Sequence, residues 1–177
     1  MRWFLTCVAL LPMLSSCSEK PVPQPPFVEF TTSQANDARQ SAQSIIGAKG
    51  QALFVCGQAD GLGLFTADWE KGFSPDGMKD GRLVFLIRND GKPDLYFRDA
   101  TGAYVSATGD GGEVRRISDP GRQIETWMIS HQSTGITETH NITMAPGSKL
   151  VDLWTSNKPT SPIGASAKLF RSNCVRA

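Results

Sequence analysis

The chain has 177 residues, of which 40% are hydrophobic and 20% are charged, a composition that suits one packed domain. The formal net charge is only +1. This balance argues against a nucleic-acid partner and against binding to an anionic membrane by charge alone. With 17 glycines and 11 prolines, the chain is expected to contain many turns and few long helices.

The first 16 residues differ in composition from the rest. Arg2 is followed by a mostly apolar run from Trp3 to Leu14. The run is too short to span a bilayer, which takes about 20 apolar residues, but it has the length and flanks of a signal-peptide core. We therefore expect residues 1–16 to be removed on export; a disordered or buried N-terminal segment is the alternative. Arg2 is the one charged residue in this segment, so its removal would leave 17 basic and 17 acidic side chains and a balanced charge.

The residues Leu14-Ser15-Ser16-Cys17 resemble the lipobox of bacterial lipoproteins, in which small residues precede a cysteine. The resemblance implies that a diacylglycerol is attached to the Cys17 thiol, that the chain is cut before Cys17, and that the new amine carries a further acyl chain such as palmitate. In that family Ser18, rather than aspartate, after the cysteine implies sorting to the periplasmic side of the outer membrane. The membrane is thus an expected partner, because two or more acyl chains anchor a protein firmly.

Export also accounts for the four cysteines of the chain. Cys7 leaves with the signal peptide and Cys17 carries the lipid. Cys56 and Cys174 then remain in an oxidising compartment, where disulfides persist. We expect them to form a disulfide; two free buried cysteines are the alternative.

A tether and a short helix follow. Residues 17–30 contain the lipidated cysteine and a proline-rich stretch, Ser18–Pro26, with four prolines, which is typical of an extended spacer. Residues 31–47 predict a helix that Thr32 or Ser33 caps and that Gly47 ends. Its apolar side chains recur at helical spacing: Ala35, Ala38, Ala42, Ile45 and Ile46.

Residues 48–177 predict an antiparallel β domain, because the apolar period becomes two and turn residues recur every few residues. The fold class we expect is mainly β, either an up-and-down barrel of lipocalin-like or lysozyme-inhibitor-like type or a β-sandwich. Cys56 and Cys174, in the first and last strands, would hold those strands side by side, as barrel closure requires. Residues 72–81 read as a loop, and the expected strands are 51–58, 62–69, 82–88, 94–99, 103–107, 113–118, 123–132, 136–145, 149–156 and 167–174.

The hairpin around Thr134-Gly135 gives the candidate site. A two-residue loop there would place Ile129 opposite His140. One face of the hairpin would then gather apolar residues together with both histidines of the chain and one glutamate. We consider three interpretations: a polar end of a ligand cavity, a metal site of two imidazoles and a carboxylate, or histidines hydrogen-bonded at the barrel rim. The candidate ligand-binding residues are Trp127, His131, Glu138 and His140; we assign no metal, cofactor or catalytic residue.

The sequence contains no Gly-x-Ser-x-Gly, His-Glu-x-x-His, Walker or Cys-x-x-Cys motif. It therefore favours a non-catalytic, lipid-anchored binding module that takes a small apolar ligand or an envelope protein. A structural envelope or secretion-machinery lipoprotein is one alternative, and a metal-binding or enzymatic barrel is another.

A further alternative comes from the placement of Cys56 and Cys174, which is similar to that of the terminal disulfide in periplasmic inhibitors of C-type lysozymes. These inhibitors are lipoproteins with small barrels. Their Ser-Gly-x-x-Tyr inhibitory loop has no match in this chain, and the nearest fragment is Thr101-Gly102-Ala103-Tyr104. No site residue is carried over from that family.

Overall fold

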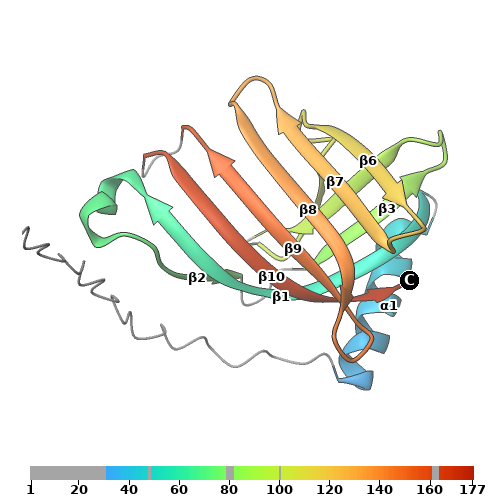
Figure 1. Ribbon diagram of the computed structural model, residues 1–177. Helices are drawn as coiled ribbons and strands as arrows, with labels where there is room; N and C mark the ends of the chain where they lie inside the picture. The colour runs from blue at the N-terminus through green and yellow to red at the C-terminus, as the bar shows by residue number, and fades with distance from the viewer. Residues whose placement is uncertain (1–30, 48, 79–81, 100, 161–163) are drawn as a thin grey trace, which may run out of the picture.

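The computed structural model describes residues 31–47, 49–78, 82–99, 101–160 and 164–177. The expected signal peptide, lipobox and tether lie outside these described residues. One antiparallel sheet of ten strands curls into a half-barrel, and a helix lies against its outside (Figure 1). The prediction of a mainly β fold is confirmed. Of the two expected architectures, a barrel and a sandwich, the single curled sheet is closer to the barrel.

The helical elements are α1 (Thr32–Ile46) and a 3₁₀ turn, η1 (Thr66–Lys71). The strands are β1 (Gly50–Phe65), β2 (Ser74–Met78), β3 (Leu83–Arg88), β4 (Pro93–Arg98), β5 (Tyr104–Ser106), β6 (Glu113–Asp119), β7 (Ile124–His131), β8 (Ile136–Ala145), β9 (Lys149–Lys158) and β10 (Ser166–Arg176).

Neighbouring strands of the sheet are mostly consecutive in the chain. The order is β5-β4-β3-β1-β10-β9-β8-β7-β6, with β2 paired to β1 outside this path. The pairing of β1 with β10 is the main exception, since it joins the first strand to the last. The two edges are then β5 and β6, which follow each other in the sequence, and β4 contacts β6 across the seam between them.

The prediction of separate strands at 51–58 and 62–69 is wrong, because β1 runs without a break from Gly50 to Phe65. Gly61 lies within the predicted gap between these strands, and its backbone lies close to β10. A Cβ atom at Gly61 would lie 2.0 Å from the Leu169 carbonyl oxygen, so this position admits only glycine without a shift.

The predicted loop at 72–81 also contains a strand, β2. It pairs only with β1, so its other edge is free, and a free edge tolerates the missing N–H of Pro75. The helix is present where it was expected. Its cap is Thr31, one residue before the expected positions: the Gln34 amide donates to the Thr31 hydroxyl and the Gln34 side chain accepts from the Thr31 amide.

The β7–β8 hairpin has a four-residue loop, residues 132–135, rather than the predicted two-residue loop. His131 lies opposite Ile136, and Trp127 lies opposite His140. The Gly135 amide donates to the His131 carbonyl at 2.8 Å with Gly135 at φ 68°. The predicted register is therefore wrong by two residues. The predicted sorting of side chains onto two faces survives, because a shift of two preserves the side of each residue.

Two apolar clusters hold the domain together. The larger fills the inner, concave face and takes residues from most of the strands, including Phe85, Trp127 and Phe170. The smaller lies on the outer face of β1, β3 and β4, where Ala38 and Ala42 of α1 pack against the sheet. Alanine is small, so the helix backbone lies close to the strands.

Cys56 and Cys174 form a disulfide, as expected. They lie directly opposite each other on β1 and β10 and are 0% and 6% exposed. The bond closes a span of 118 residues.

We predict that Cys56→Ser lowers the free energy of unfolding by about 4–5 kcal/mol under oxidising conditions, because the disulfide restricts the unfolded chain. Thermal unfolding with and without a reductant measures this. The reduced wild type should melt close to the variant. Equal melting temperatures of the variant and the wild type without reductant would contradict the stabilising role.

Candidate functional site

Of the four candidate residues, the structure brings Trp127 and His140 together. They lie directly opposite each other on β7 and β8, point to the inner face, and are 0% exposed. Glu138 lies two residues along β8 toward the hairpin loop. His131 lies four residues along β7 from Trp127, or about 13 Å at the usual rise of a strand.

Glu138 and His131 have other partners. The Ser156 hydroxyl donates to Glu138 Oε1 at 2.8 Å, and Lys158 Nζ lies 4.0 Å from the same oxygen. His131 lies against Gly112, where an added Cβ would come within 2.9 Å of the ring. The four candidates therefore do not converge on one point. Within the described ranges no set of three His, Cys, Asp or Glu residues is placed to hold a metal ion.

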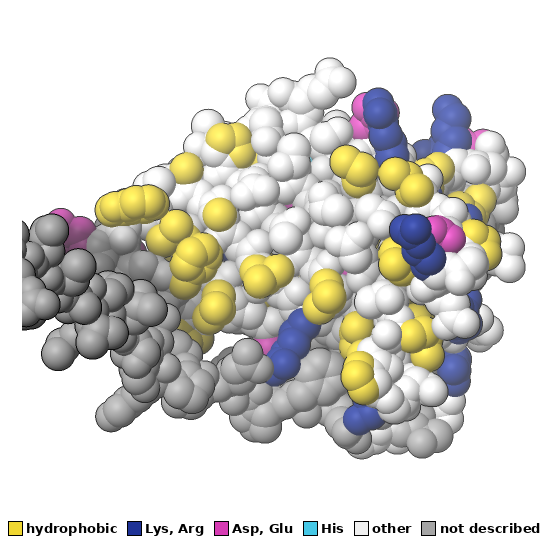
Figure 2. All heavy atoms as spheres, in the orientation of Figure 1, with side chains coloured by type: hydrophobic (Ala, Val, Ile, Leu, Met, Phe, Trp, Pro, Cys, Tyr) yellow, Lys and Arg dark blue, Asp and Glu magenta, His cyan; other side chains and the backbone are white. Residues whose placement is uncertain are grey.

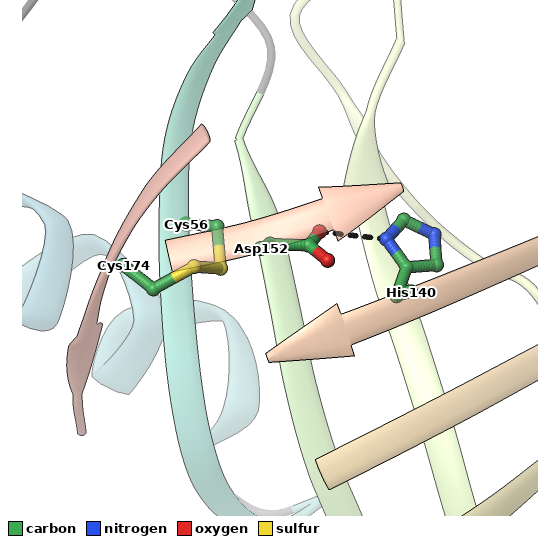
Figure 3. The surroundings of a disulfide bond; sticks show 4 residues. All are labelled: Cys56, His140, Asp152 and Cys174. Atoms are coloured by element: carbon green, nitrogen blue, oxygen red, sulfur yellow. Dashed lines mark hydrogen bonds and ion pairs between the residues drawn. A yellow bond between two sulfur atoms is a disulfide. The ribbon is translucent and has the colours of Figure 1, made fainter. Parts of the chain in front are cut away.

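The partner of His140 is Asp152, a residue that the sequence analysis missed. His140 Nδ1 and Asp152 Oδ2 are 2.7 Å apart, and both side chains are 0% exposed. Figure 3 shows that Asp152 extends from β9 between the His140 ring and the Cys56–Cys174 disulfide. A signal was present in the sequence: Asp152 alternates with Trp154 and Ser156, so period two places it on the inner face.

Aromatic rings surround the His140–Asp152 pair. The His140 ring stacks on Trp154 with centroids 4.9 Å apart and meets Phe85 edge-on at 5.2 Å. Trp127 lies 5.3 Å from Phe85, and Phe170 lies 4.6 Å from Trp154. These rings fill the middle of the half-barrel, which leaves little room there for a lipocalin-type ligand.

The pair is shielded from solvent, and this limits what it can do. His140 Nε2 and Asp152 Oδ1 have no hydrogen-bond partner among the described residues, nor have the indole nitrogens of Trp127 and Trp154. Uncompensated polar burial costs free energy, so the 2.7 Å His140–Asp152 hydrogen bond is the main compensation inside this cluster. Because neither side chain reaches solvent, the geometry supports a role in joining β8 to β9 rather than in proton transfer to a dissolved substrate.

A second charged group lies toward one end of the inner face. Arg116 donates two hydrogen bonds to Glu125, from Nε at 2.8 Å and from Nη2 at 2.9 Å. The Ser118 hydroxyl donates a third at 2.8 Å. Burial tends to raise the pKa of Glu125, but the hydrogen bonds from Arg116 and Ser118 outweigh it and hold this pKa below its ordinary value.

We predict that Asp152→Asn lowers the free energy of unfolding by about 1–3 kcal/mol, the usual cost of leaving a buried polar group without its hydrogen-bond partner. The substitution keeps the side-chain shape and replaces one carboxylate oxygen by an amide NH₂ group, which disturbs the bond to His140 Nδ1. Urea unfolding measures the loss. Asp110→Asn, at an exposed turn residue, is the matched control and should unfold like the wild type. An Asp152→Asn variant as stable as the control would show that the pair contributes nothing.

A pH series tests the Glu125 group. The lowered pKa means that ionised Glu125 stabilises the fold fully above its ordinary pKa of 4.5, and that this stabilisation is lost as the pH falls through the lower folded-state value. Glu125→Gln should therefore be less stable than the wild type at pH 6–7, and the difference should shrink as the pH falls below about 4. Urea unfolding at several pH values measures it; a difference that stays constant down to pH 3 would contradict this account.

Comparison with known proteins adds no relative to this picture. No known protein-family profile matches the chain, and no curated protein sequence matches it. Across the described part of the chain, α1 and the other helical residues are too short or too polar to cross a bilayer.

Proposed function

We propose that this chain is a lipid-anchored, non-catalytic binding module of the bacterial envelope, held on the periplasmic side of the outer membrane, and that it binds a protein partner through the outside of its half-barrel. The sequence before and after Cys17 supports the anchor: an apolar run, small residues before the cysteine, and a proline-rich stretch after it. The Cys56–Cys174 disulfide is consistent with an oxidising compartment.

The observation that carries the binding role is a sheet surface that no other described helix or strand covers. We define the outer face as the convex side of β6–β10 and the adjoining half of β1. One row of this face crosses the strands in register, with three exposed apolar side chains and two threonines: Leu62, Leu169, Thr155, Thr139 and Met128. Leu62, Leu169 and Met128 are 40%, 52% and 43% exposed.

Further apolar side chains lie beside this row. Leu153 on β9 is 47% exposed and Ile117 on β6 is 60% exposed. Between them, in the same register, lie Asn141 and Thr126, whose side chains share a 2.9 Å hydrogen bond. The outer face thus mixes exposed apolar side chains with threonine and asparagine and carries few charges over several strands.

Figure 2 shows the side of the molecule that carries β7–β10. Apolar side chains are spread over a mostly uncharged surface, and most of the Lys and Arg side chains in view lie toward one end. Cores of protein–protein interfaces are depleted in charge and enriched in methionine and other apolar side chains, and larger exposed apolar patches mark interaction sites. The aromatic rings in the middle of the half-barrel point the same way, because they leave little room there for a large apolar ligand.

Photo-crosslinking in intact cells tests the binding surface. A photo-crosslinking amino acid is placed at Leu153 of the full chain in intact cells, and at the exposed α1 residue Asp37 as the matched control. Crosslinking at Leu153 to one defined protein, and not at Asp37, is expected. The absence of a Leu153-specific protein adduct would overturn the binding role.

The same cells carry the anchor test. Cys17→Ala should accumulate as an uncut precursor without lipid, because the thiol that takes the diacylglycerol is missing, and intact-mass analysis reads this directly. Normal cleavage and membrane fractionation of the Cys17→Ala chain would overturn the lipid anchor and leave the crosslinking result to stand alone.

A further inference from the structure

The inner face is filled in its middle but hollowed at one end. There a cup of about 170 Å³ lies where the β6–β7 turn and the ends of β1 and β10 meet. Its apolar lining comes from inner-face positions of β1, β8 and β9, namely Phe54, Ile142 and Leu150, together with Ile124. Phe54 and Ile142 are almost fully buried, so they form its floor.

Charges of both signs line the same cup: Arg176, Asp119 and Glu125. The Arg176 guanidinium carbon lies 5.4 Å from the centroid of the Phe54 ring. Stacking on a ring leaves the five N–H donors, which lie in the guanidinium plane, able to bind an anion. The backbone carbonyl of Arg176 accepts from Arg39, so the position of the chain here does not depend on the Arg176 side chain.

The acidic side of the cup keeps capacity to accept hydrogen bonds. Glu125 accepts three, two from Arg116 and one from Ser118. Asp119 Oδ1 accepts from the Arg122 amide, and its Oδ2 lies 3.7 Å from Arg122 Nε. A carboxylate offers about four lone-pair positions. A small cation in the cup would thus meet Glu125 with an acceptor position left, and Asp119, whose side chain is 48% exposed, at the rim.

We propose that this cup binds a free α-amino acid with an aliphatic side chain. The ligand carboxylate lies at Arg176, the ammonium group lies at Asp119 and Glu125, and the side chain rests on Phe54, Ile142 and Leu150. Three features select this class. The volume of about 170 Å³ is well below that of a drug-sized site. The charges match a zwitterion, and the apolar floor matches an aliphatic group. Mouths of β-barrels are also common ligand sites.

Calorimetric titration of the purified full chain at neutral pH tests this with L-leucine as the probe. Saturable 1:1 binding with a Kd below about 1 mM is expected. N-acetyl-L-leucine lacks the ammonium group and L-leucinamide lacks the carboxylate, so each should bind at least about tenfold more weakly. No saturable binding of L-leucine, or equal binding of either derivative, would overturn the proposal.

Variants locate the site. Arg176→Gln should weaken L-leucine binding at least about tenfold by removing the cation, and Leu150→Trp should abolish binding by filling the cup. Arg115→Gln is the matched control, because Arg115 is a largely exposed arginine on the outer face. Circular dichroism checks that each variant is folded. Binding that survives Arg176→Gln unchanged would overturn the assignment, and either result leaves the protein-binding role of the outer face untouched.

Discussion

The antiparallel pairing of β1 with β10 is the constraint on which the rest of the structure depends. Without it, the two groups of strands, β3–β5 and β6–β9, would be separate meanders, each with one face uncovered. Their joining curls the sheet so that both groups turn apolar side chains toward a shared interior. The disulfide lies within this pairing, and Gly61 allows the two strands to lie close farther along it. The pairing of β1 with β10 joins the strands that lie farthest apart in the sequence. It therefore carries the largest loss of chain entropy from loop closure in this fold.

Alternation of apolar residues along the chain was enough to predict the strand-rich fold and which residues of the β7–β8 hairpin point inward. The disulfide was predicted on other grounds, from the cysteine count and the expected export. The interpretation of the sequence failed where one residue type has two uses. Glycine is common in turns, but Gly61 lies inside β1 and allows this strand to lie close to β10. Proline is common in loops, but Pro75 lies in the edge strand β2. The loop length of the hairpin was also misjudged, since period two fixes the face of a strand but leaves its register free in steps of two residues.

The candidate site was predicted in part for a related reason. His140 and Trp127 were recognised as inward-facing, but their partners come from other parts of the chain. Asp152 reaches His140 only because β9 lies beside β8, and the register between those strands is a tertiary property. Arg176 and Phe54 likewise meet only through the β1–β10 pairing. The interior that results is divided: aromatic rings and the buried His140–Asp152 hydrogen bond occupy its middle, and a cup lined by charged residues remains at one end.

The position of the seam has a consequence for the connectivity of the chain. β10 ends beside the beginning of β1, where the amide of Ala177 donates to the carbonyl of Leu53, and the open seam lies between the consecutive strands β5 and β6. A circular permutant with a short linker from Ala177 to Gly50 and new ends in the turn between β5 and β6 would keep every strand pair. The nine strands of the main path would then follow one another in space as they do along the chain, so the longest-range pairing of the natural protein would become a local hairpin.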